Sequence, residues 1–380
     1  DAEPYICLNV GSGTVEEARS WVEYCNASQE TTLTSLRRDN GHADPFNVRF
    51  WGIGNENWGC GGNMTPEYYA DLYRRYATYV RRTAGEGAKL IACGSTPGHP
   101  DWDERFLAVM KGAFNLVDSF ALHHYVGQGK HAVEFSDEDY DELLGTIDAI
   151  DRRLARATGL AQAYSTYNHR LDMILDEWGT WFKQATVETG LYQQNTMQDA
   201  LFTAAAFHCF HRHGERLWMT NMAQTVNVLQ ALVLTRGPQM LTTPTYHVYE
   251  MFKPHRDGYL VACDVEDSAV IRIPDSDVQN AISVSPTASP DGAELTISVL
   301  NLDLSSTLSV GMNISGADSW KVSQVRRLAT GDIRSHNTFE EPNTVRPEEV
   351  PVADSGDLSK LLLPPQSITT IDLKRENPKE

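Results

Sequence analysis

Residues 48–63 read VRFWGIGNENWGCGGN. The apolar run at 48–54 predicts a buried β-strand, and it places Asn55 and Glu56 at the C-terminal end of that strand. In folds that alternate strands and helices, catalytic groups collect at this end of the sheet. A partly desolvated carboxyl group there would have a raised pKa, which suits a general acid, whereas an isolated acid at a strand end is more often a simple turn residue.

The first 250 residues repeat this pattern of short apolar runs separated by helical stretches. Near-continuous apolar strands are typical of a parallel sheet that is covered on both faces. Six strands are compatible with either an open doubly wound sheet or a (β/α)8 barrel. Strands are predicted at 4–10, 48–54, 89–94, 117–123, 171–176 and 216–221, and helices at 14–26, from Thr65-Pro66 onward, at 137–158 and at 194–213.

Beyond about residue 255 the pattern changes to short alternating runs broken by Pro, Gly, Asp and Asn. Several short strands at near-regular spacing predict an antiparallel β-sandwich. We therefore expect two domains, an α/β domain over 1–254 and an all-β domain over 255–380.

The composition limits the partners of the chain. Its 380 residues are 41% hydrophobic and 22% charged, which is typical of a globular protein. The net charge of −19 argues against nucleic acid and against an anionic membrane surface, because both would repel it. The sequence contains no run of about 18 apolar residues, so no membrane-spanning segment is predicted. The six cysteines lack CxxC spacing, so we expect no zinc site.

A second acidic strand end follows at residues 173–182, MILDEWGTWF. Strand alternation predicts that only one of Asp176 and Glu177 faces a site. Tryptophans flank both acidic strand ends, Trp51 and Trp58 around Glu56 and Trp178 and Trp181 after Glu177. Aromatic rings stack on sugars, although most tryptophans are core residues. Two such carboxylates together are typical of glycoside hydrolysis, which needs a pair across the scissile bond.

Two further motifs carry polar groups. ALHHYVG (121–127) ends a strand with His123, His124 and Tyr125, for which we favour hydrogen bonding over a metal site. MAQTVNVLQAL (222–232) places the amides of Gln224 and Asn227 in an apolar stretch, where buried amides would need partners.

Two other enzyme classes fit less well. A Ser-His-Asp hydrolase on an α/β fold would need a GxSxG elbow, which the sequence lacks. A dinucleotide site would need GxGxxG after a strand, and Glu16 stands where the third glycine belongs.

In order along the chain, GNENWGCGGN, LHHY, LDEWGTW and AQTVNV resemble glycoside hydrolase family 51, the α-L-arabinofuranosidases. The segment LNVGSGTVEEARSWVEYCN near the start extends the resemblance over essentially the whole chain. The resemblance implies a (β/α)8 TIM barrel followed by a C-terminal β-sandwich, no cofactor and no metal, a homo-oligomer that is commonly a hexamer, and a cytoplasmic location in preference to secretion.

The same resemblance assigns roles to individual residues. Glu56 would be the general acid/base and Glu177 the nucleophile. The expected substrate-binding residues are Asn55 on the arabinose 2-hydroxyl, Tyr125 orienting the nucleophile with His123 close behind it, and Trp181 and Gln224 lining the sugar subsite.

The chain departs from the family pattern at its start. The family carries its acid/base on barrel strand four, but only one predicted strand, at 4–10, precedes Glu56. We therefore expect the first two barrel strands, with their substrate-binding Glu and Asn, to be missing. Residues 1–380 would then be a truncated or partial copy of a longer protein, or one of two chains that complete a barrel.

The expected reaction is retaining, exo-acting removal of arabinofuranosyl residues from arabinan, arabinoxylan or their oligosaccharides. Two alternatives stay open. The same carboxylate pair serves xylosidases and endoglucanases, and a truncated chain could bind carbohydrate without turnover.

Overall fold

The computed structural model describes residues 2–266, 268–271, 279–314, 320–351, 358 and 360–375. Within it the chain forms two compact units. The first comprises Asp1–His124, Arg153–Glu177 and Glu215–Thr220, and the second comprises Tyr125–Arg152, Trp178–Gly214 and Asn221–Glu380. No helix in the described part of the chain is both long and apolar enough to cross a membrane.

A six-stranded sheet contains the two acidic strand ends. Its strands follow the chain order, and the pairs from β1 to β4 are parallel, so that Ile53 lies beside Leu8 and Ala92. All six predicted strands are therefore confirmed. They are β1 (Tyr5–Leu8), β2 (Phe50–Ile53), β3 (Lys89–Cys93), β4 (Ser119–Val126), β5 (Asp172–Thr180) and β6 (Leu217–Met222).

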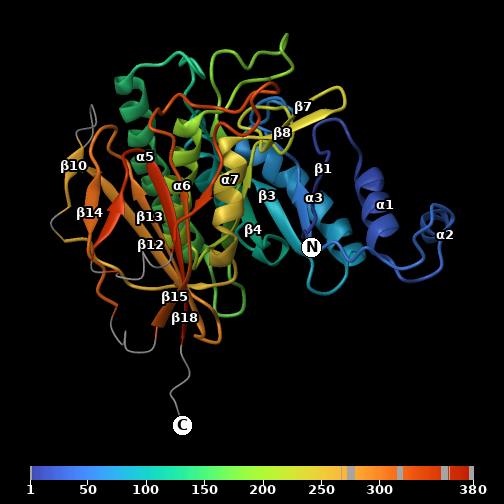
Figure 1. Cartoon of the computed structure of the whole chain (residues 1–380). Helices are drawn as coiled ribbons and strands as arrows, with labels where there is room; N and C mark the ends of the chain where they lie inside the picture. Colours follow the sequence, from blue (N-terminus) through green and yellow to red (C-terminus); the bar gives the residue numbers. More distant parts are fainter. Residues whose placement is uncertain are drawn as a thin grey trace. The chain divides into compact units, whose positions relative to one another are not determined.

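Helix starts in the first unit follow their capping residues. Helix α1 (Val15–Asn26) begins at a capping box in which Thr14 and Glu17 each satisfy a backbone N–H of the other. Helix α3 (Pro66–Ala84) begins because Thr65 caps it and Pro66 occupies its first turn. Helix α1 contacts α3 and α2 (Thr32–Asp39), all blue in Figure 1. Helix α4 (Trp102–Val109), like α2, was not predicted.

Tyrosines at helical spacing give α3 a buried face. Tyr69, Tyr73, Tyr76 and Val80 are each at most 4% exposed. The Tyr69 hydroxyl donates to the carbonyl of Ile53 and accepts from the N–H of Cys93. This one side chain therefore joins the C-terminal ends of β2 and β3, directly before Glu56.

Helices α6 and α7 belong to the second unit, and the residues of α5 are divided between the two units. Helix α6 (Met197–Arg212) starts at a capping box of Thr196 and Asp199, three residues later than predicted. Helix α5 (Asp137–Tyr164) extends past its predicted end at residue 158. Helix α7 (Pro244–Met251) and the hairpin β7 (Val233–Arg236) with β8 (Gln239–Thr242) were not predicted.

The C-terminal region is antiparallel, as predicted. Strands β12, β13, β18 and β15 lie side by side, orange to red in Figure 1. A shorter pair, β14 with β17, belongs to the same hydrophobic core. The strands of the larger sheet are β16 (Glu348–Glu349), β15 (Trp320–Leu328), β18 (Ser367–Arg375), β13 (Glu294–Asn301), β12 (Ile282–Ala288) and β9 (Tyr259–Leu260), and the two-stranded pairs are β14 (Leu308–Val310) with β17 (Leu361–Leu363) and β10 (Val270–Ile271) with β11 (Gln279–Asn280).

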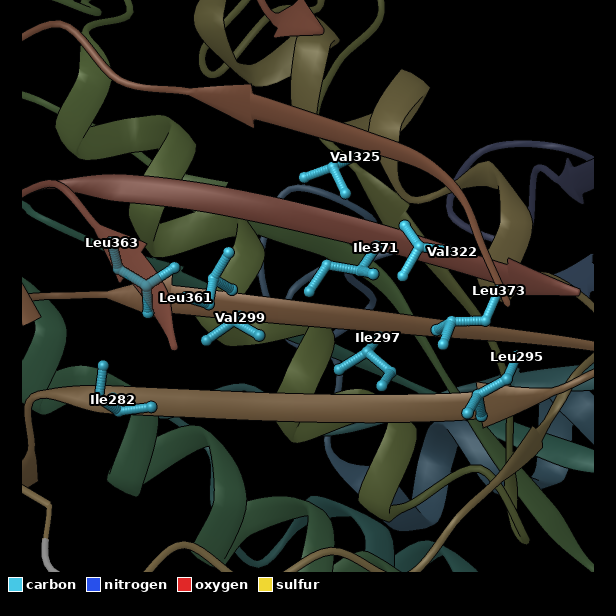
Figure 2. Close-up of a cluster of buried hydrophobic side chains, with 10 residues drawn as sticks. All are labelled: Ile282, Leu295, Ile297, Val299, Val322, Val325, Leu361, Leu363, Ile371 and Leu373. Carbon is cyan, nitrogen blue, oxygen red and sulfur yellow. The ribbon is translucent and has the colours of Figure 1, made fainter. Parts of the chain in front are cut away.

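Alternation along these strands separates an apolar face from a polar face. Leu295, Ile297 and Val299 of β13 turn toward the core, where Ile371 and Leu373 join them (Figure 2). Serines on the opposite face form hydrogen bonds with His208 of α6. The two ring nitrogens of His208 lie 2.8 Å from the hydroxyl oxygens of Ser283 and Ser298. Helix α6 therefore packs on the sheet through hydrogen bonds. The domain boundary at 254/255 stays a prediction.

Candidate active site

Glu56 lies in a tight turn directly after β2. Its backbone adopts a left-handed conformation, with φ +46°, and its carbonyl accepts the N–H groups of Gly59 and Gly61 at 2.8 and 2.9 Å. Gly61 has no room for a side chain, because a Cβ there would lie 1.8 Å from the carbonyl oxygen of Asn55. The turn therefore needs glycine at position 61, and it holds Asn55 and Glu56 at the strand end as predicted.

His123 of β4 connects Glu56 to the acids of β5. Its Nδ1 lies 2.9 Å from Glu56 Oε1 and 3.5 Å from Glu177 Oε2, while its Nε2 lies 3.2 Å from Asp176 Oδ1. The ring is almost fully buried, whereas the side chains of Glu56 and Glu177 are 22% and 28% exposed. One carboxylate oxygen of Glu56 and one of Glu177 lie within 4.8 Å of each other. The predicted pair of carboxylates is thus brought together around one imidazole.

The prediction that only one of Asp176 and Glu177 faces the site is wrong. Both carboxylates lie within 3.5 Å of His123, each beside a different ring nitrogen. Strand alternation sends the two Cβ atoms in opposite directions, but it does not limit the reach of the carboxylates. Asp176 also accepts a hydrogen bond from the Tyr5 hydroxyl of β1 at 3.0 Å. The more buried acid is therefore held from two sides, and Glu177 keeps access to solvent.

The charges around His123 and Glu56 shift the pKa values of both groups. Burial disfavours the imidazolium of His123, but the carboxylates of Asp176 and Glu56 outweigh it and raise its pKa to about 10. The hydrogen bond with His123 in turn lowers the pKa of Glu56, although burial acts in the opposite direction. The predicted raised pKa of Glu56 is therefore wrong for the free site, because a buried cation lies against it.

Two more side chains of the same turn lie at the site: Cys60, which was not predicted there, and Trp58, one of the tryptophans that suggested a sugar site. The Cys60 thiol donates to Glu56 Oε2 at 3.1 Å. Trp58 is half-buried, stacks on His99 and presents its ring edge to His123, with the ring centroids 5.4 and 6.0 Å away. The sequence could have indicated Cys60 as a site residue, because it lies between two glycines and four residues after Glu56.

Two of the tryptophans that suggested a sugar site are core residues. Trp51 and Trp178 are both 0% exposed. The indole N–H of Trp51 donates to the carbonyl of Val48, and Trp178 packs its ring edge to face against Phe210. Their neighbours in sequence made them look like part of the site, but both side chains point into the protein.

Three predicted substrate-binding residues belong to the second unit. Tyr125 and Trp181 form an edge-to-face pair with ring centroids 5.2 Å apart. Both pack on a small apolar cluster that includes Ala223, next to Gln224. The indole N–H of Trp181 donates to the carbonyl of Ala185 at 2.9 Å. Their contact with substrate stays a prediction.

The amides of Gln224 and Asn227, which were expected to be buried, are not buried. Gln224 is exposed, and Asn227 exchanges hydrogen bonds with Thr235 near the surface. The buried amide of this stretch is Gln230, which accepts from the N–H of Thr180 at 2.8 Å. The segment is irregular between β6 and β7, so sequence periodicity did not indicate which side chains point inward.

Two groups of side chains in the described part of the chain have donor atoms close enough to hold a metal ion. One is Glu56, His123 and Glu177, and the other is Asp151, Cys209 and His213. In the second group a guanidinium nitrogen of Arg212 already lies 3.1 Å from the Asp151 oxygen that would bind a cation. All six cysteines are free thiols.

Comparison with known families agrees with the motifs. The model of the α-L-arabinofuranosidase C-terminal domain matches residues 176–367, and that of the α-L-arabinofuranosidase 1 domain matches residues 11–142. Together these two regions include Glu56, His123 and Glu177.

Individual proteins match over nearly the whole chain. The intracellular exo-α-L-arabinofuranosidase of Bacteroides ovatus is 35% identical over 98% of this chain and 73% of its own length. The family 51 arabinofuranosidase structure from Xanthomonas axonopodis pv. citri is 32% identical, with a TM-score of 0.87 over 98% of this chain and 76% of that one. The Thermotoga maritima α-L-arabinofuranosidase in complex with arabinose is 29% identical, with a TM-score of 0.83 over the same shares.

These likenesses confirm the predicted fold class, a (β/α)8-barrel type of α/β fold followed by an antiparallel β domain. The chain spans about three quarters of the length of these relatives. It shares with the two solved structures the arrangement of its elements. The chain belongs to glycoside hydrolase family 51, the family of the α-L-arabinofuranosidases.

Proposed function

We propose that this chain is a retaining, exo-acting α-L-arabinofuranosidase that acts on arabinan, arabinoxylan or their oligosaccharides. One observation carries the proposal: an oxygen of Glu56, which follows β2, lies within 4.8 Å of an oxygen of Glu177, which lies in β5 of the same sheet. Retaining enzymes hold their carboxyl groups about 5–5.5 Å apart, and inverting enzymes roughly 6.5–9.5 Å apart. The separation supports a double displacement.

In the first step Glu177 attacks the anomeric carbon, and Glu56 gives a proton to the departing glycosidic oxygen. The products are an arabinosyl ester of Glu177 and a free alcohol. In the second step Glu56 takes a proton from water, whose oxygen attacks the anomeric carbon and releases Glu177 and arabinose. Both inversions at that carbon together retain its configuration.

His123 sets the protonation of this pair. Its raised pKa keeps it cationic at neutral pH, and it holds Glu56 ionised in the free site. The proton for the first step is available along the 2.9 Å contact from Nδ1 to Glu56 Oε1. Esterification of Glu177 then removes one negative charge 3.5 Å from the same nitrogen, which favours ionised Glu56 as the base.

The test is hydrolysis of 4-nitrophenyl α-L-arabinofuranoside by this chain beside its Glu177→Gln variant. We expect turnover by the parent chain and none by the variant, with NMR showing that the first-formed arabinose keeps its anomeric configuration. Hydrolysis of 4-nitrophenyl β-D-xylopyranoside in preference would contradict the furanoside assignment. Arabinose binding by calorimetry without any turnover would instead indicate a non-catalytic binding protein.

The role of Glu56 has its own test. Glu56→Ala removes the acid and the base but leaves the nucleophile, so a substrate with a good leaving group still forms the ester. We expect azide to restore turnover by displacing Glu177 from the ester, which releases α-arabinofuranosyl azide with the configuration of the substrate. An equal loss on good and poor leaving groups would argue against Glu56 as the acid.

The remaining assignments rest on family membership. Asn55 would bind the arabinose 2-hydroxyl, and Tyr125, Trp181 and Gln224 would contribute to the sugar subsite, so alanine at each should raise KM. A homo-oligomer, by family analogy a hexamer, predicts a mass by light scattering several times that of the 42.4 kDa chain. The Bacteroides ovatus relative is named as intracellular, which supports a cytoplasmic location.

A further inference from the structure

The Gly-Cys-Gly-Gly segment after Glu56 has no assigned role, although it lies against the site. The turn closes on itself, because Asn63 N–H donates to the carbonyl of Gly59 and the Asn57 amide donates to that of Gly61. Gly59 and Gly61 both return their N–H groups to the Glu56 carbonyl. These bonds bring residue 60 back over residue 56.

Cys60 uses that position to contact the acid/base directly. Its Sγ lies 3.1 Å from Glu56 Oε2, while the other carboxylate oxygen, Oε1, lies 2.9 Å from His123. The two oxygens are thus held by donors from different parts of the chain, one in the turn and one on β4. A carboxylate held at both oxygens has fewer side-chain orientations than one held at a single oxygen.

We propose that Cys60 is a positioning residue for the reaction, holding the Glu56 carboxylate through Oε2 against His123 on Oε1. The proposal rests on the assignment of Glu56 as acid/base. A thiol suits this position because it donates weakly to a carboxylate and also accepts weakly from a protonated carboxyl group. It therefore accompanies Glu56 through both of its protonation states.

The charges around Glu56 make the effect of Cys60 measurable. Glu56 faces His123 from β4, Asp176 and Glu177 from β5, and the buried Cys93 thiol from β3. Hydrogen bonds from His123 and, to a smaller extent, Cys60 lower the pKa of Glu56. Reciprocally, the hydrogen bond to Glu56 raises the pKa of the Cys60 thiol.

The first experiment compares pH profiles of kcat/KM for Cys60→Ala, Cys60→Ser and the control Cys263→Ala. The alkaline limb follows the loss of the proton that His123 and Glu56 share along their 2.9 Å contact. We expect Cys60→Ala to move that limb upward by about 0.3–1 pH unit, because a net hydrogen bond is lost, with KM changed less than twofold. Cys60→Ser retains a donor and should restore at least half of the shift. Cys263 is exposed in the second unit, and its variant should match the parent.

The second experiment measures the contact without any turnover. Alkylation of Cys60 by iodoacetamide is followed by mass spectrometry across pH in the parent chain and in Glu56→Gln, with Cys263 as the internal reference. We expect the pH midpoint of Cys60 alkylation to fall in Glu56→Gln, because the neighbouring anion is gone. The midpoint of Cys263 should not move.

The outcomes separate this proposal from the proposed function. Failure of the parent chain to hydrolyse the arabinofuranoside rejects the function, and the alkylation midpoint then decides on the contact alone. An unmoved Cys60 midpoint in Glu56→Gln overturns the proposal. The proposal is also overturned if Cys60→Ala has the same alkaline limb as the parent. It is overturned as well if the only effect of Cys60→Ala is a raised KM that Cys60→Ser shows to the same extent.

Discussion

The Nδ1 atom of His123 lies 2.9 Å from the Oε1 atom of Glu56, which joins residues 67 positions apart in the chain. The contact places a buried imidazolium between three carboxylates, since Asp176 and Glu177 lie within 3.5 Å of the same ring. Without this cation, three acidic groups would repel one another at the centre of the site. His123 therefore sets both the charge and the geometry of the catalytic pair.

His123→Asn should raise the pKa of Glu56, since the hydrogen bond with His123 is the largest cause of its lowering. We expect the alkaline limb of kcat/KM to move downward, because His123 no longer holds a proton for Glu56 up to about pH 10 and Glu56 must carry that proton itself. We also expect the free energy of unfolding to fall by about 3–5 kcal/mol, as for other buried ion pairs that lose one partner. Because the pKa of His123 is raised to about 10, its stabilisation is complete below pH 6.5 and is lost as pH rises toward 10.

The matched control for this variant is His124→Asn. Burial, followed by the charge of Arg153, lowers the pKa of His124 to about 4, so it is neutral where His123 is charged. Its loss should destabilise the protein without moving the alkaline limb. A limb that moves equally in both variants would contradict the role of His123.

Gly61→Ala should impair catalysis while Gly59→Ala spares it. A Cβ at Gly61 would lie 1.8 Å from the Asn55 oxygen and 2.9 Å from the Glu56 carbonyl carbon, so the backbone of the site must shift. At Gly59 the nearest atom would be 3.8 Å away, an ordinary contact. A displacement near 1 Å can reduce rates about 10²-fold, and kcat/KM for the arabinofuranoside measures it. Similar kinetics for the two variants would refute this reading of the turn.

Tyr69→Phe should destabilise the first unit. The hydroxyl joins the Ile53 carbonyl to the Cys93 N–H in the fully buried space under α3. Its removal leaves two buried polar groups without that partner, at a cost of about 1–3 kcal/mol each at most. Chemical denaturation measures the loss, and Tyr68→Phe, whose ring is 57% exposed one position earlier, is the control. A loss no greater than in the control would contradict this.

Acid should weaken the second unit through its buried histidines. Burial lowers the pKa of His208 far below 6.5, that of His211 to about 4 and that of His255 to about 3. The unfolded chain binds these protons near pH 6.5, so stability is lost as pH falls from 6.5 toward 4. His211→Gln should reduce the slope of unfolding free energy against pH by up to about 1.4 kcal/mol per unit. A slope that is the same in His211→Gln as in the parent chain would contradict this prediction.

Local patterns sufficed for much of the architecture. Apolar runs bounded by glycine and polar residues predicted all six parallel strands, because burial on both faces excludes polar side chains from them. Capping residues Thr14 and Thr65 marked helix starts to within one residue. Helix α2 escaped prediction because it is short and only two of its residues are buried, so its apolar stripe is faint.

By itself, the sequence located the acidic and histidine motifs on or directly after strands, because that depends only on neighbours along the chain. Glu56, His123 and Glu177 were identified in this way. Glu56 follows β2 as predicted, whereas His123 and Glu177 lie inside β4 and β5, which run past their predicted ends. Only the tertiary structure decided what surrounds them: the cation on His123, the inward turn of Asp176 toward Tyr5, and the thiol of Cys60 on Glu56. Contacts and pKa values depend on groups that the fold brings together from distant segments. From the sequence, Glu56 was expected to be a desolvated acid with a raised pKa, but His123, 67 residues away, lowers its pKa.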